Sequence, residues 1–395
     1  MTDHVLTINA GSSSLKFSLR RAEAGAAPLL VGQVERIGSE SPRLLARAGE
    51  ERPEPRTLPR DEARDAEGAM RVVLGLVGDR AGDARVAAVG HRVVHGGPDR
   101  GAPAVLDDAE VAALAELNPL APLHQPHNLA AIAAARRAFP EAVQVACFDT
   151  AFHRGRPFEA EAFAVPRAYF DRGVRRYGFH GLSYDFIAGE LARTRPELAA
   201  GRVVVAHLGA GASMCAMRDG RSVDTTMGLS ALDGLPMGTR CGQLDPGVVL
   251  WLLETEGMDA AGIGDLLYRK SGLLGLSGVS SDMRELEASD AREAAEAIGH
   301  FCFRIRREIG GLAASLGGLD ALVFTAGIGE HSARIRAEVC GGLGWLGVEI
   351  DAEANARHAA DISASGAPVK VLVMPTDEEA VIARAALRAL ERAGA

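Results

Sequence analysis

The feature that most constrains this chain is a short pattern that occurs twice: an apolar strand, a turn of small residues and a second strand. Residues 5–19 read VLTINAGSSSLKFSL, and residues 202–217 read RVVVAHLGAGASMCAM. Residues 321–332 (ALVFTAGIGEHS) again run from an apolar strand into a glycine-rich loop. Because one complete copy opens each half of the chain, the pattern predicts a duplicated α/β fold with a nucleotide between the copies.

The small-residue turns are suited to hold an anion. In the first copy, small residues follow Asn9, and Lys16 lies just beyond them. Backbone N–H groups and hydroxyls in such a loop can approach a phosphate closely, and the lysine adds a positive charge. The Gly-x-x-x-x-Gly-Lys-Ser/Thr motif of a Walker A loop is absent. An ordinary hairpin turn is also rich in serine and glycine, so on this stretch alone a phosphate site and a plain turn stay equally open.

The composition limits the classes of protein to which this chain can belong. A length of 395 residues predicts two domains, and a formal net charge of −9 disfavours nucleic acid as the main partner. The five cysteines are scattered and form no Cys-x-x-Cys pair, which predicts a reducing cytoplasm rather than a disulfide framework. The chain enters a strand within a few residues of Met1, and no apolar run approaches the ~18 residues of a membrane helix. Neither a signal peptide nor a membrane partner is therefore expected.

Two segments are expected to be loops. Residues 39–67 are rich in arginine, glutamate and proline, which favours a solvated hairpin or loop without chemistry. Residues 271–284 (SGLLGLSGVSSDMR) separate two predicted helices and are expected to be a flexible loop. Both expectations follow from composition, because neither segment shows a clear helical or strand period.

Two helix starts carry candidate capping residues. Asn128 precedes the predicted helix 129–139 and is expected to cap it. Thr376 and Glu379 have the spacing of a capping box for the terminal helix. A capping role for Glu379 leaves Glu378 available for another function.

Two charged residues follow predicted strands closely. The strand 84–89 leads into GHRVVHGG, which places Arg92 in a candidate binding loop, although a surface salt bridge would also explain an arginine there. The strand 142–148 is followed at once by Asp149. Because the chemistry of open α/β sheets gathers at the carboxyl ends of strands, a functional role is favoured for this carboxylate.

Further candidates lie in glycine- and proline-rich loops. The segment RGVRRYGFHG bears His180, and the long loop 224–245 bears Arg240 between two glycines. Loops of that length in compact domains are usually functional. His124 lies in a loop that three prolines stiffen, and it is either catalytic or bound to the entry of the next helix.

Together these residues are the parts of a phosphoryl-transfer site. Arg92 and Arg240 can clamp a planar anion or a transferring phosphoryl group. The carboxylates of Asp149 and Glu378 can hold Mg²⁺ directly or through water. His180 can donate a hydrogen bond to a developing oxyanion. A reaction of this kind depends on positioning and charge neutralisation more than on covalent chemistry.

With these residues in place, the chain resembles the acetokinase family. Residues 5–16 and 203–217 resemble the family's two signatures, and the resemblance runs essentially from end to end. GHRVVHGG, FDTAFH, RRYGFHG, GLPMGTR, TAGIGE and PTDEE resemble further family motifs in the family's order. The matching signature residues are Asn9, Gly11, Ser12, Lys16, His207, Gly209, Gly211 and Ser213.

The resemblance implies a fold, a reaction and partners. The family is similar to sugar kinases, actin and chaperone ATPases, with two duplicated ribonuclease H-like domains and a nucleotide cleft between them. It implies an N-terminal domain over 1–152 that is joined by the terminal helix 378–395, and a C-terminal nucleotide-binding domain over 153–377. It further implies a cytoplasmic homodimer that reversibly transfers the ATP γ-phosphoryl group to acetate, giving acetyl phosphate and ADP. Mg²⁺ is the implied metal, with Mn²⁺ as an alternative.

The resemblance also assigns roles to single residues. Catalytic roles fall to Asp149, His180, Arg240, Arg92 and His124. Acetate is expected to contact Arg92, Val94, Leu123, Phe179 and Ala231. The metal is expected at Asn9 and Glu378. ATP is expected to contact Lys16, Ser12, His207, Leu208, Gly209, Ala210, Gly211, Asp282, Met283, Arg284, Gly327, Ile328, Gly329, Glu330 and His331.

The chemistry of the substrate bears on the role of Asp149. A carboxylate substrate with a pKa of about 4.3 is already an anion at neutral pH, so it needs no general base. Asp149 is therefore expected to organise Mg²⁺, water or an arginine rather than to abstract a proton. Loss of activity at every pH in an Asp149→Asn variant is the corresponding prediction.

Three positions depart from the family pattern. Position 231 is alanine where many members carry proline, which could widen the substrate pocket enough for propionate. Ala210 and His331 stand where asparagine is common. A propionate or butyrate kinase is therefore the near alternative, and a non-catalytic ATP-binding regulator on the same fold is an alternative from another class. A sugar kinase would need a polar pocket, which Val94, Leu123 and Phe179 disfavour.

Overall fold

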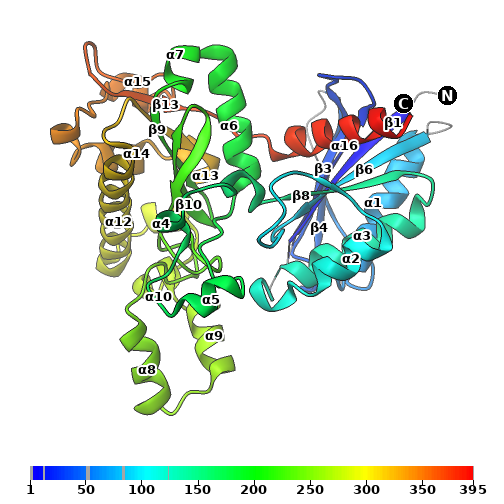
Figure 1. Cartoon of the computed structure of the whole chain (residues 1–395), viewed down its shortest axis with the longest axis horizontal. Helices are drawn as coiled ribbons and strands as arrows, with labels where there is room; N and C mark the ends of the chain where they lie inside the picture. The colour runs from blue at the N-terminus through cyan, green and yellow to red at the C-terminus, as the bar shows by residue number, and fades with distance from the viewer. Residues whose placement is uncertain (1–2, 12–13, 50–53, 82–84, 123, 395) are drawn as a thin grey trace. The chain divides into compact units, whose positions relative to one another are not determined.

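The protein divides into two compact units in the computed structural model, which describes residues 3–11, 14–49, 54–81, 85–122 and 124–394 (Figure 1). The first unit is Met1–Phe152 together with Asp377–Ala395, and the second is His153–Thr376. Within the described residues, no helix is both long enough and apolar enough to span a membrane.

The first unit is built on one mixed sheet of eight strands in the order β5-β4-β3-β2-β1-β6-β8-β7. Strands β1 to β5 pair in antiparallel fashion, whereas β6 runs parallel to β1 and β8 parallel to β6. The strand bounds are β1 Asp3–Ala10, β2 Ser14–Arg21, β3 Pro28–Glu35, β4 Arg43–Ala48, β5 Glu54–Thr57, β6 Arg85–Val93, β7 Ala104–Val105 and β8 Val143–Phe148.

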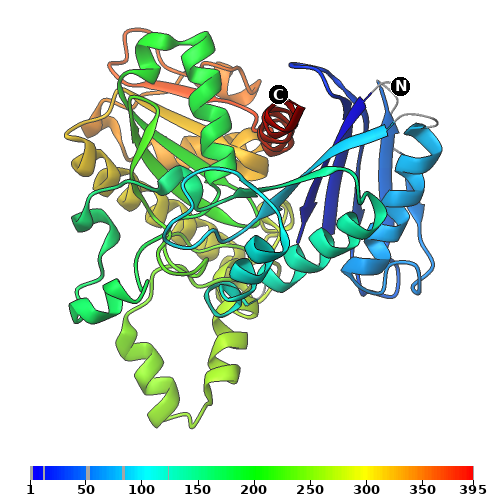
Figure 2. The same cartoon turned by 45° about the vertical axis from the view of Figure 1, so that its right-hand side comes forward.

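Helices cover both faces of this sheet, which is why its central strands are apolar almost throughout. Val5, Leu6 and Ile8 of β1 are all buried. Figure 2 shows the terminal helix α16 on one face and α1 on the other, and α16 contacts β1, β6 and β8. The helices of the unit are α1 Ala66–Ala81, α2 Asp108–Ala115, η1 Asn118–Leu120, α3 Gln125–Ala138 and α16 Glu378–Gly394, and η2 Ala151–His153 joins it to the second unit.

The second unit carries a sheet of five strands in the order β11-β10-β9-β12-β13. Here β9, β10 and β11 are antiparallel, and β12 and β13 run parallel to β9. The strand bounds are β9 Arg202–Leu208, β10 Ala212–Arg218, β11 Arg221–Thr225, β12 Ala321–Thr325 and β13 Lys370–Val373.

In the sequence, the helices of the second unit precede β9, lie between β11 and β12, or lie between β12 and β13. The longest, α12, is amphipathic and packs on β9, β10 and β11. The bounds are α4 Phe158–Glu161, α5 Arg167–Asp171, α6 Gly181–Thr194, α7 Pro196–Ala199, α8 Pro246–Glu254, α9 Ala260–Arg269, α10 Gly272–Ser277, α11 Met283–Glu287, α12 Arg292–Leu316, α13 Ala326–His331, α14 Ala333–Cys340, η3 Gly344–Leu346 and α15 Ala352–Ala356.

The two sheets repeat one topology. Strands β3-β2-β1-β6-β8 of the first unit and β11-β10-β9-β12-β13 of the second have the same order and the same directions. In both, an antiparallel meander is followed by two parallel strands beside its first member. The mixed α/β fold and its duplication, predicted from the repeated strand–turn–strand pattern, are confirmed.

Of the two alternatives for residues 39–67, a solvated hairpin or a loop, the hairpin is confirmed, because β4 and β5 pair as a hairpin that extends the first sheet. Two loop predictions were wrong. The segment 271–284 contains α10, and the glycine-rich segment after β12 is not a turn but the short helix α13. Glycine and serine have low helix propensity, so the sequence does not predict these helices. Their formation depends on packing, of α10 against α12 and of α13 against β9.

Both predicted helix caps were also wrong. Helix α3 begins at Gln125, so Asn128 lies inside it, and its side chain bonds elsewhere. At the start of α16, Asp377 rather than Thr376 accepts the hydrogen bond from the Ala380 N–H, at 2.8 Å. In each case more than one polar residue had the spacing of a cap, and the local sequence did not distinguish them.

Candidate active site

The first group of candidate residues lies at the carboxyl ends of neighbouring parallel strands. Arg92 is the penultimate residue of β6, a strand that continues through Val93 rather than ending at 89 as predicted. Asp149 follows β8 directly, and Asn9 is the penultimate residue of β1. Because parallel strands end at the same edge of a sheet, these side chains meet although the sequence separates them widely.

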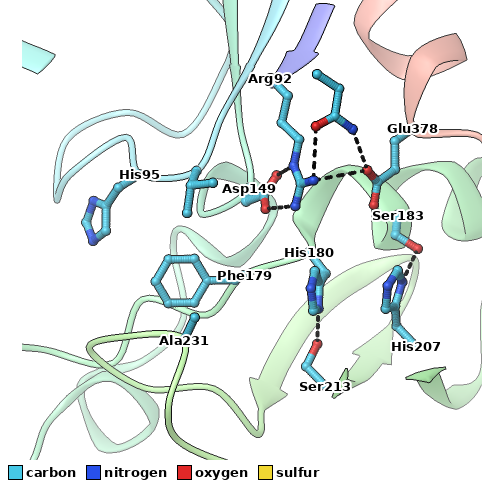
Figure 3. Close-up of polar contacts among 12 residues, drawn as sticks. Arg92, His95, Asp149, Phe179, His180, Ser183, His207, Ser213, Ala231 and Glu378 are labelled. Atoms are coloured by element: carbon cyan, nitrogen blue, oxygen red, sulfur yellow. Dashed lines mark hydrogen bonds and ion pairs between the residues drawn. The ribbon is translucent and has the colours of Figure 1, made fainter. Parts of the chain in front are cut away.

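Arg92 is held in a network of oxygen acceptors (Figure 3). Its Nε lies 2.8 Å and its Nη2 2.6 Å from the two carboxylate oxygens of Asp149, so the guanidinium and the carboxylate pair as two forks. Nη1 donates to Asn9 Oδ1 at 3.2 Å and lies 3.6 Å from Glu378 Oε2. Asn9 Nδ2 in turn donates to Glu378 Oε2 at 3.4 Å. The structure thus brings four predicted site residues into contact.

The carboxylates of this network stabilise the charged form of Arg92. Burial lowers the pKa of Arg92, but attraction to Asp149 and Glu378 outweighs burial, and the pKa is raised above its usual value. The Arg92 side chain is 21% exposed, whereas Asp149 is 2% exposed. The arginine therefore stays charged and accessible at its outer edge, while its partner carboxylate is enclosed.

The next residue of α16, Glu379, is a second carboxylate beside this network, and its pKa is shifted. Burial raises the pKa of the Glu379 carboxyl, Lys16 lowers it, and the neighbouring Glu378 raises it further. Lys16, a predicted ATP ligand, extends from β2 with an exposed side chain and is paired in register with Asn9. Ser12 and Leu123, the other predicted ligands from this part of the chain, lie outside the described residues.

Helix α3 fixes the backbone that follows β6. Asn128 accepts the Val94 N–H at 3.0 Å through Oδ1 and donates to the Ala10 carbonyl at 2.6 Å through Nδ2. Gln125 accepts the His95 N–H and donates to the His95 carbonyl. The Asn128 amide thus joins the end of β1 to the residue after β6, and Gln125 holds the next residue, His95. The sequence analysis predicted neither of these roles. His124, a predicted catalytic residue, is the N-cap residue of α3 and makes no side-chain cap bond.

The donor set around Arg92 is compatible with a divalent cation. Mg²⁺ is usually bound through one or two carboxylates, with waters and substrate phosphates completing the octahedron. Asp149 and Glu378 supply two carboxylates and Asn9 an amide oxygen within one hydrogen-bonded network. Among the described residues, no cluster of three or more His, Cys, Asp and Glu side chains forms a cage for a metal. This combination fits a cation held jointly with a substrate better than a structural metal.

The second group of candidate residues surrounds the hairpin turn of the second unit. The turn 209–211 joins β9 to β10, and the Gly209 N–H bonds to the Gly211 carbonyl at 3.1 Å. A β-carbon on Gly211 would lie 3.3 Å from His180 Nε2 and 4.0 Å from Arg240 Nη1. Glycine at this position therefore leaves the space between the histidine, the arginine and the turn open.

His180 is the N-cap residue of α6, in the left-handed conformation with φ of 58°. A non-glycine residue in this region costs of order 1–3 kcal/mol, so its surroundings must compensate. Its Nδ1 lies 2.8 Å from Ser213 Oγ, and its ring stacks on that of His207 at 4.3 Å. His207 Nδ1 is held at 2.8 Å by Ser183 Oγ (Figure 3).

The loop that carries Arg240 is fixed by backbone contacts. The Gly238 N–H bonds to the Ala210 carbonyl, and the first N–H groups of α10 bond to the carbonyls of Met237 and Gly238. Gly272 has φ of 64°, and a β-carbon there would lie 2.1 Å from the Met237 carbonyl oxygen, so only glycine allows this approach. Arg240 Nη1 donates to the Ala231 carbonyl at 3.4 Å.

The remaining predicted nucleotide-binding segments converge on the same turn. A β-carbon on Gly209 would lie 3.7 Å from the Ala326 side chain at the start of α13, and one on Gly238 would lie 3.0 Å from the Ser281 carbonyl. Asp282 then caps α11 and pairs with Arg284, whose side chain is exposed. Three segments, 209–211, 281–284 and 326–331, are thus neighbours. Their side chains are buried at Leu208 and Met283 and exposed or half-buried at Ala210, Ile328, Glu330 and His331.

Arg336 was missed by sequence reasoning. It is fully buried in α14, and it donates to the carbonyls of Gly329 and Glu330, each at 2.9 Å, at the end of α13. It also donates to the side chain and carbonyl of Asn355 and to His358 Nδ1. Burial lowers the pKa of Arg336. An arginine on an amphipathic helix gives no local signal that distinguishes this role from a surface position.

Candidate substrate-binding residues lie in both units. Val94 follows β6 and is buried, and Phe179 precedes His180 and is also buried. Figure 3 shows the Phe179 ring beside Ala231, a half-buried residue of the long loop. Each of these side chains is apolar, which is the chemistry that contact with a short aliphatic group needs.

Comparison with known proteins gives one consistent result. Residues 4–384 match the model of the acetokinase family. The chain is 53% identical to the acetate kinase of Methylocella silvestris, over 100% of both chains. It resembles the crystal structure of Porphyromonas gingivalis acetate kinase (34% identity, TM-score 0.87, 98% of this chain and 100% of the other). It also resembles that of a propionate kinase from Francisella tularensis (33% identity, TM-score 0.90, 98% and 99%).

Proposed function

This chain belongs to the acetokinase family, and we propose that it is an acetate kinase, which reversibly transfers the γ-phosphoryl group of ATP to acetate. The products are acetyl phosphate and ADP. The observation that carries the proposal is Arg92, a cation oriented by the forked pair with Asp149 and followed directly in the chain by apolar residues. A fixed guanidinium beside apolar side chains suits a small carboxylate with a short aliphatic tail.

The residues of the second unit supply the donors that phosphoryl transfer needs. Negative charge spreads over the phosphoryl oxygens in the transition state, so cations and N–H donors fixed in advance lower the barrier. We assign Arg240 and His180 Nε2 to this role, because both face the open side of Gly211. The segments 207–211, 282–284 and 327–331 and Lys16 are assigned to ATP, and His124 to an auxiliary position near the phosphoryl group.

Asp149 is assigned to orienting Arg92 rather than to proton transfer. Acetate is already ionised at neutral pH, so the reaction requires no general base. Both oxygens of Asp149 accept hydrogen bonds from Arg92, which is the arrangement of a positioning group. Asn9 and Glu378 are assigned to Mg²⁺, which, when bound, neutralises charge on the nucleotide phosphates.

A second candidate, a propionate kinase, is favoured by the small side chain of Ala231 beside Phe179. One additional methylene in an apolar pocket is worth only ~1–3 kcal/mol, so turnover of both acids is expected. Val94 and Phe179 supply the other apolar contacts in the assignment. The order of preference therefore depends on how much space Ala231 leaves.

The test is acyl phosphate formation from ATP and Mg²⁺, trapped with hydroxylamine, across acetate, propionate and butyrate. We expect the highest kcat/KM with acetate and loss of the product in Arg92→Ala. The matched control is Arg202→Ala, which removes a forked pair with Asp320 at the amino end of β9, away from the candidate residues. Highest activity with propionate or butyrate would show that the enzyme prefers the longer acid to acetate. ATP binding without formation of any acyl phosphate would indicate a non-catalytic regulator.

We further propose that the protein is a cytoplasmic homodimer. The helix α8 supports a second copy as partner, because Leu250 and Trp251 on it are 55% and 51% exposed and Val248 and Leu253 are exposed as well. Contiguous apolar exposure of this kind marks interaction sites. Sedimentation analysis of the wild type and of Trp251→Glu tests the assignment: a dimer that the substitution dissociates is expected, and a monomeric wild type would contradict it.

A further inference from the structure

One turn of helix brings two side chains of α6 to the same serine. Tyr184 follows His180 by four residues, so both lie on one face of the helix start. Ser213 Oγ of β10 lies 2.8 Å from His180 Nδ1 and 2.5 Å from the Tyr184 hydroxyl. All three atoms belong to the second unit, and Tyr184 and Ser213 are fully buried.

The single proton of the serine hydroxyl gives this chain of bonds a direction. In one direction, Tyr184 donates to Ser213, and Ser213 donates to His180 Nδ1, which is then an acceptor. In the other, His180 donates through Nδ1, and Ser213 donates to the tyrosine oxygen. A phenol is a stronger donor and a weaker acceptor than an aliphatic hydroxyl, which favours the first direction. Burial raises the pKa of Tyr184 well above its usual value, so the phenol keeps its proton.

We propose that Tyr184 and Ser213 are positioning residues that keep the proton of the neutral His180 imidazole on Nε2. The proposal rests on the proposed function, in which His180 donates to the transferring phosphoryl group. With Nδ1 accepting from Ser213, the only N–H of the neutral ring is the one on the open side of Gly211, beside Arg240 Nη1. The other tautomer would present a lone pair to an anionic oxygen and repel it.

The ring plane is fixed by a second contact. His207 stacks on His180 with 17° between the rings, and Ser183, also in the first turn of α6, holds His207 Nδ1. The stack restricts rotation of the His180 ring, and the bond from Ser213 sets which nitrogen carries the proton. The orientation and the tautomer of His180 thus have separate structural causes. A change at Tyr184 or Ser213 is therefore expected to alter the tautomer and to leave the ring orientation in place.

The experiment reads the tautomer directly. Full-length protein labelled with ¹⁵N-histidine is examined by long-range ¹H–¹⁵N correlation at pH 8, with the His180 signals assigned from His180→Gln. We expect the wild-type proton on Nε2, and a mixture of tautomers in Tyr184→Phe and in Ser213→Ala. In parallel, kcat for acyl phosphate formation is expected to fall about 10-fold in each variant, with KM for ATP changing less than about 2-fold.

The matched control is Tyr177→Phe. Tyr177 is as deeply buried in the same unit, and its hydroxyl donates to the Gly173 carbonyl at 2.7 Å, away from His180. It is expected to lose similar stability without changing the His180 signals or kcat. A wild-type proton on Nδ1, or Tyr184→Phe and Ser213→Ala spectra identical to the wild type, would overturn the proposal. A wild type that forms no acyl phosphate would instead contradict the proposed function. The two failures can be distinguished, because the NMR measurement of the tautomer does not depend on turnover.

Discussion

Arg92 in the first unit and Arg336 in the second are both surrounded by hydrogen-bond acceptors, but the acceptors differ in charge. Arg92 pairs with the carboxylates of Asp149 and Glu378. Arg336 donates to carbonyls, to an amide oxygen and to a histidine nitrogen, and within the described residues no carboxylate lies within ion-pair distance of it. Accordingly, the pKa is raised for Arg92 and lowered for Arg336.

The two arginines also differ in accessibility. Arg92 retains 21% exposure, so an incoming anion can reach it. Arg336 is enclosed completely and uses its donors to hold the last carbonyls of α13, next to the predicted ATP segment. Two sheets of the same topology therefore carry different electrostatics. Altering the first arginine's partner should affect the reaction, whereas altering the second arginine should affect folding first.

The largest effect is expected from Asp149→Asn. The change removes the charge that orients Arg92, and we expect kcat/KM for acetate to fall by at least about 10²-fold at every pH from 6 to 9, because preorganised charge is lost. Steady-state assays with hydroxylamine trapping across this range measure it. Asp320→Asn, which breaks the Arg202 pair, is the control and should keep activity. Recovery of Asp149→Asn activity at high pH would instead show that the carboxylate acts as a base.

The next largest effect is expected from removing the buried arginine, Arg336. Arg336→Met removes the buried donors that hold α13 and Asn355, and leaves those acceptors without partners. We expect a loss of about 3–5 kcal/mol in the free energy of unfolding and a raised KM for ATP. Urea unfolding monitored by circular dichroism measures the first quantity. Arg306→Met, which removes an arginine bonded to the single carbonyl of Glu338, should cost markedly less. Equal losses in the two variants would refute the structural role.

Each unit contains a buried histidine, which predicts that the fold is sensitive to acid. Burial lowers the pKa of His91 to about 4 and that of His153 to about 3. A histidine in the unfolded chain has a pKa near 6.5, so between pH 6.5 and about 4 the unfolded chain binds more protons than the folded protein. The contribution of these histidines to the free energy of unfolding is therefore fully present above pH 6.5 and is lost as the pH falls toward 4. For His91 the loss between pH 7 and 4.5 is about 2–3 kcal/mol.

The variant His91→Gln isolates this contribution. It lacks a titrating group beside Gln144, so its unfolding free energy should decline less than that of the wild type over the same interval. Urea titrations at pH 7 and pH 4.5 give the difference. Parallel declines in variant and wild type would mean that His91 is not buried in its neutral form.

The smallest effect concerns specificity. Ala231→Pro adds volume beside Phe179, and we expect the ratio of kcat/KM for acetate to that for propionate to rise about 10-fold, or ~1.4 kcal/mol. Competition between the two acids in one assay measures the ratio. Ala231→Ser, which adds less volume, should change it less. A ratio that stays constant in Ala231→Pro would show that this residue does not limit the pocket.

Some of the site could be read from local sequence. Asp149 stands directly after an apolar strand, and Arg92 and Arg240 lie in glycine-flanked segments, so position relative to strands and glycines identified them. His180 lies in a similar glycine-flanked segment, and Glu378 stands at the start of the terminal helix. The fold class followed from the repeated strand–turn–strand pattern, because hydrophobic periodicity encodes strands locally.

Other residues had no local signature. Asn128 resembled a helix cap but joins Ala10 to Val94, and Arg336 resembled a surface arginine but holds α13. Tyr184, to which the sequence analysis assigned no role, bonds Ser213. Each role depends on a partner far away in the sequence, and periodicity contains no information on which partner that is.

The sequence by itself determined the strands, the duplication and the residue types available for phosphoryl transfer. Those properties depend on alternation of apolar residues, on small turn residues and on charges at strand ends, all of which act over a few residues. The tertiary structure alone decided that Arg92 meets Asp149 and Glu378, that Ser213 meets both His180 and Tyr184, and that glycine-rich segments fold as α10 and α13. Such contacts arise because burial in a shared core selects conformations and partners that local propensity leaves undetermined.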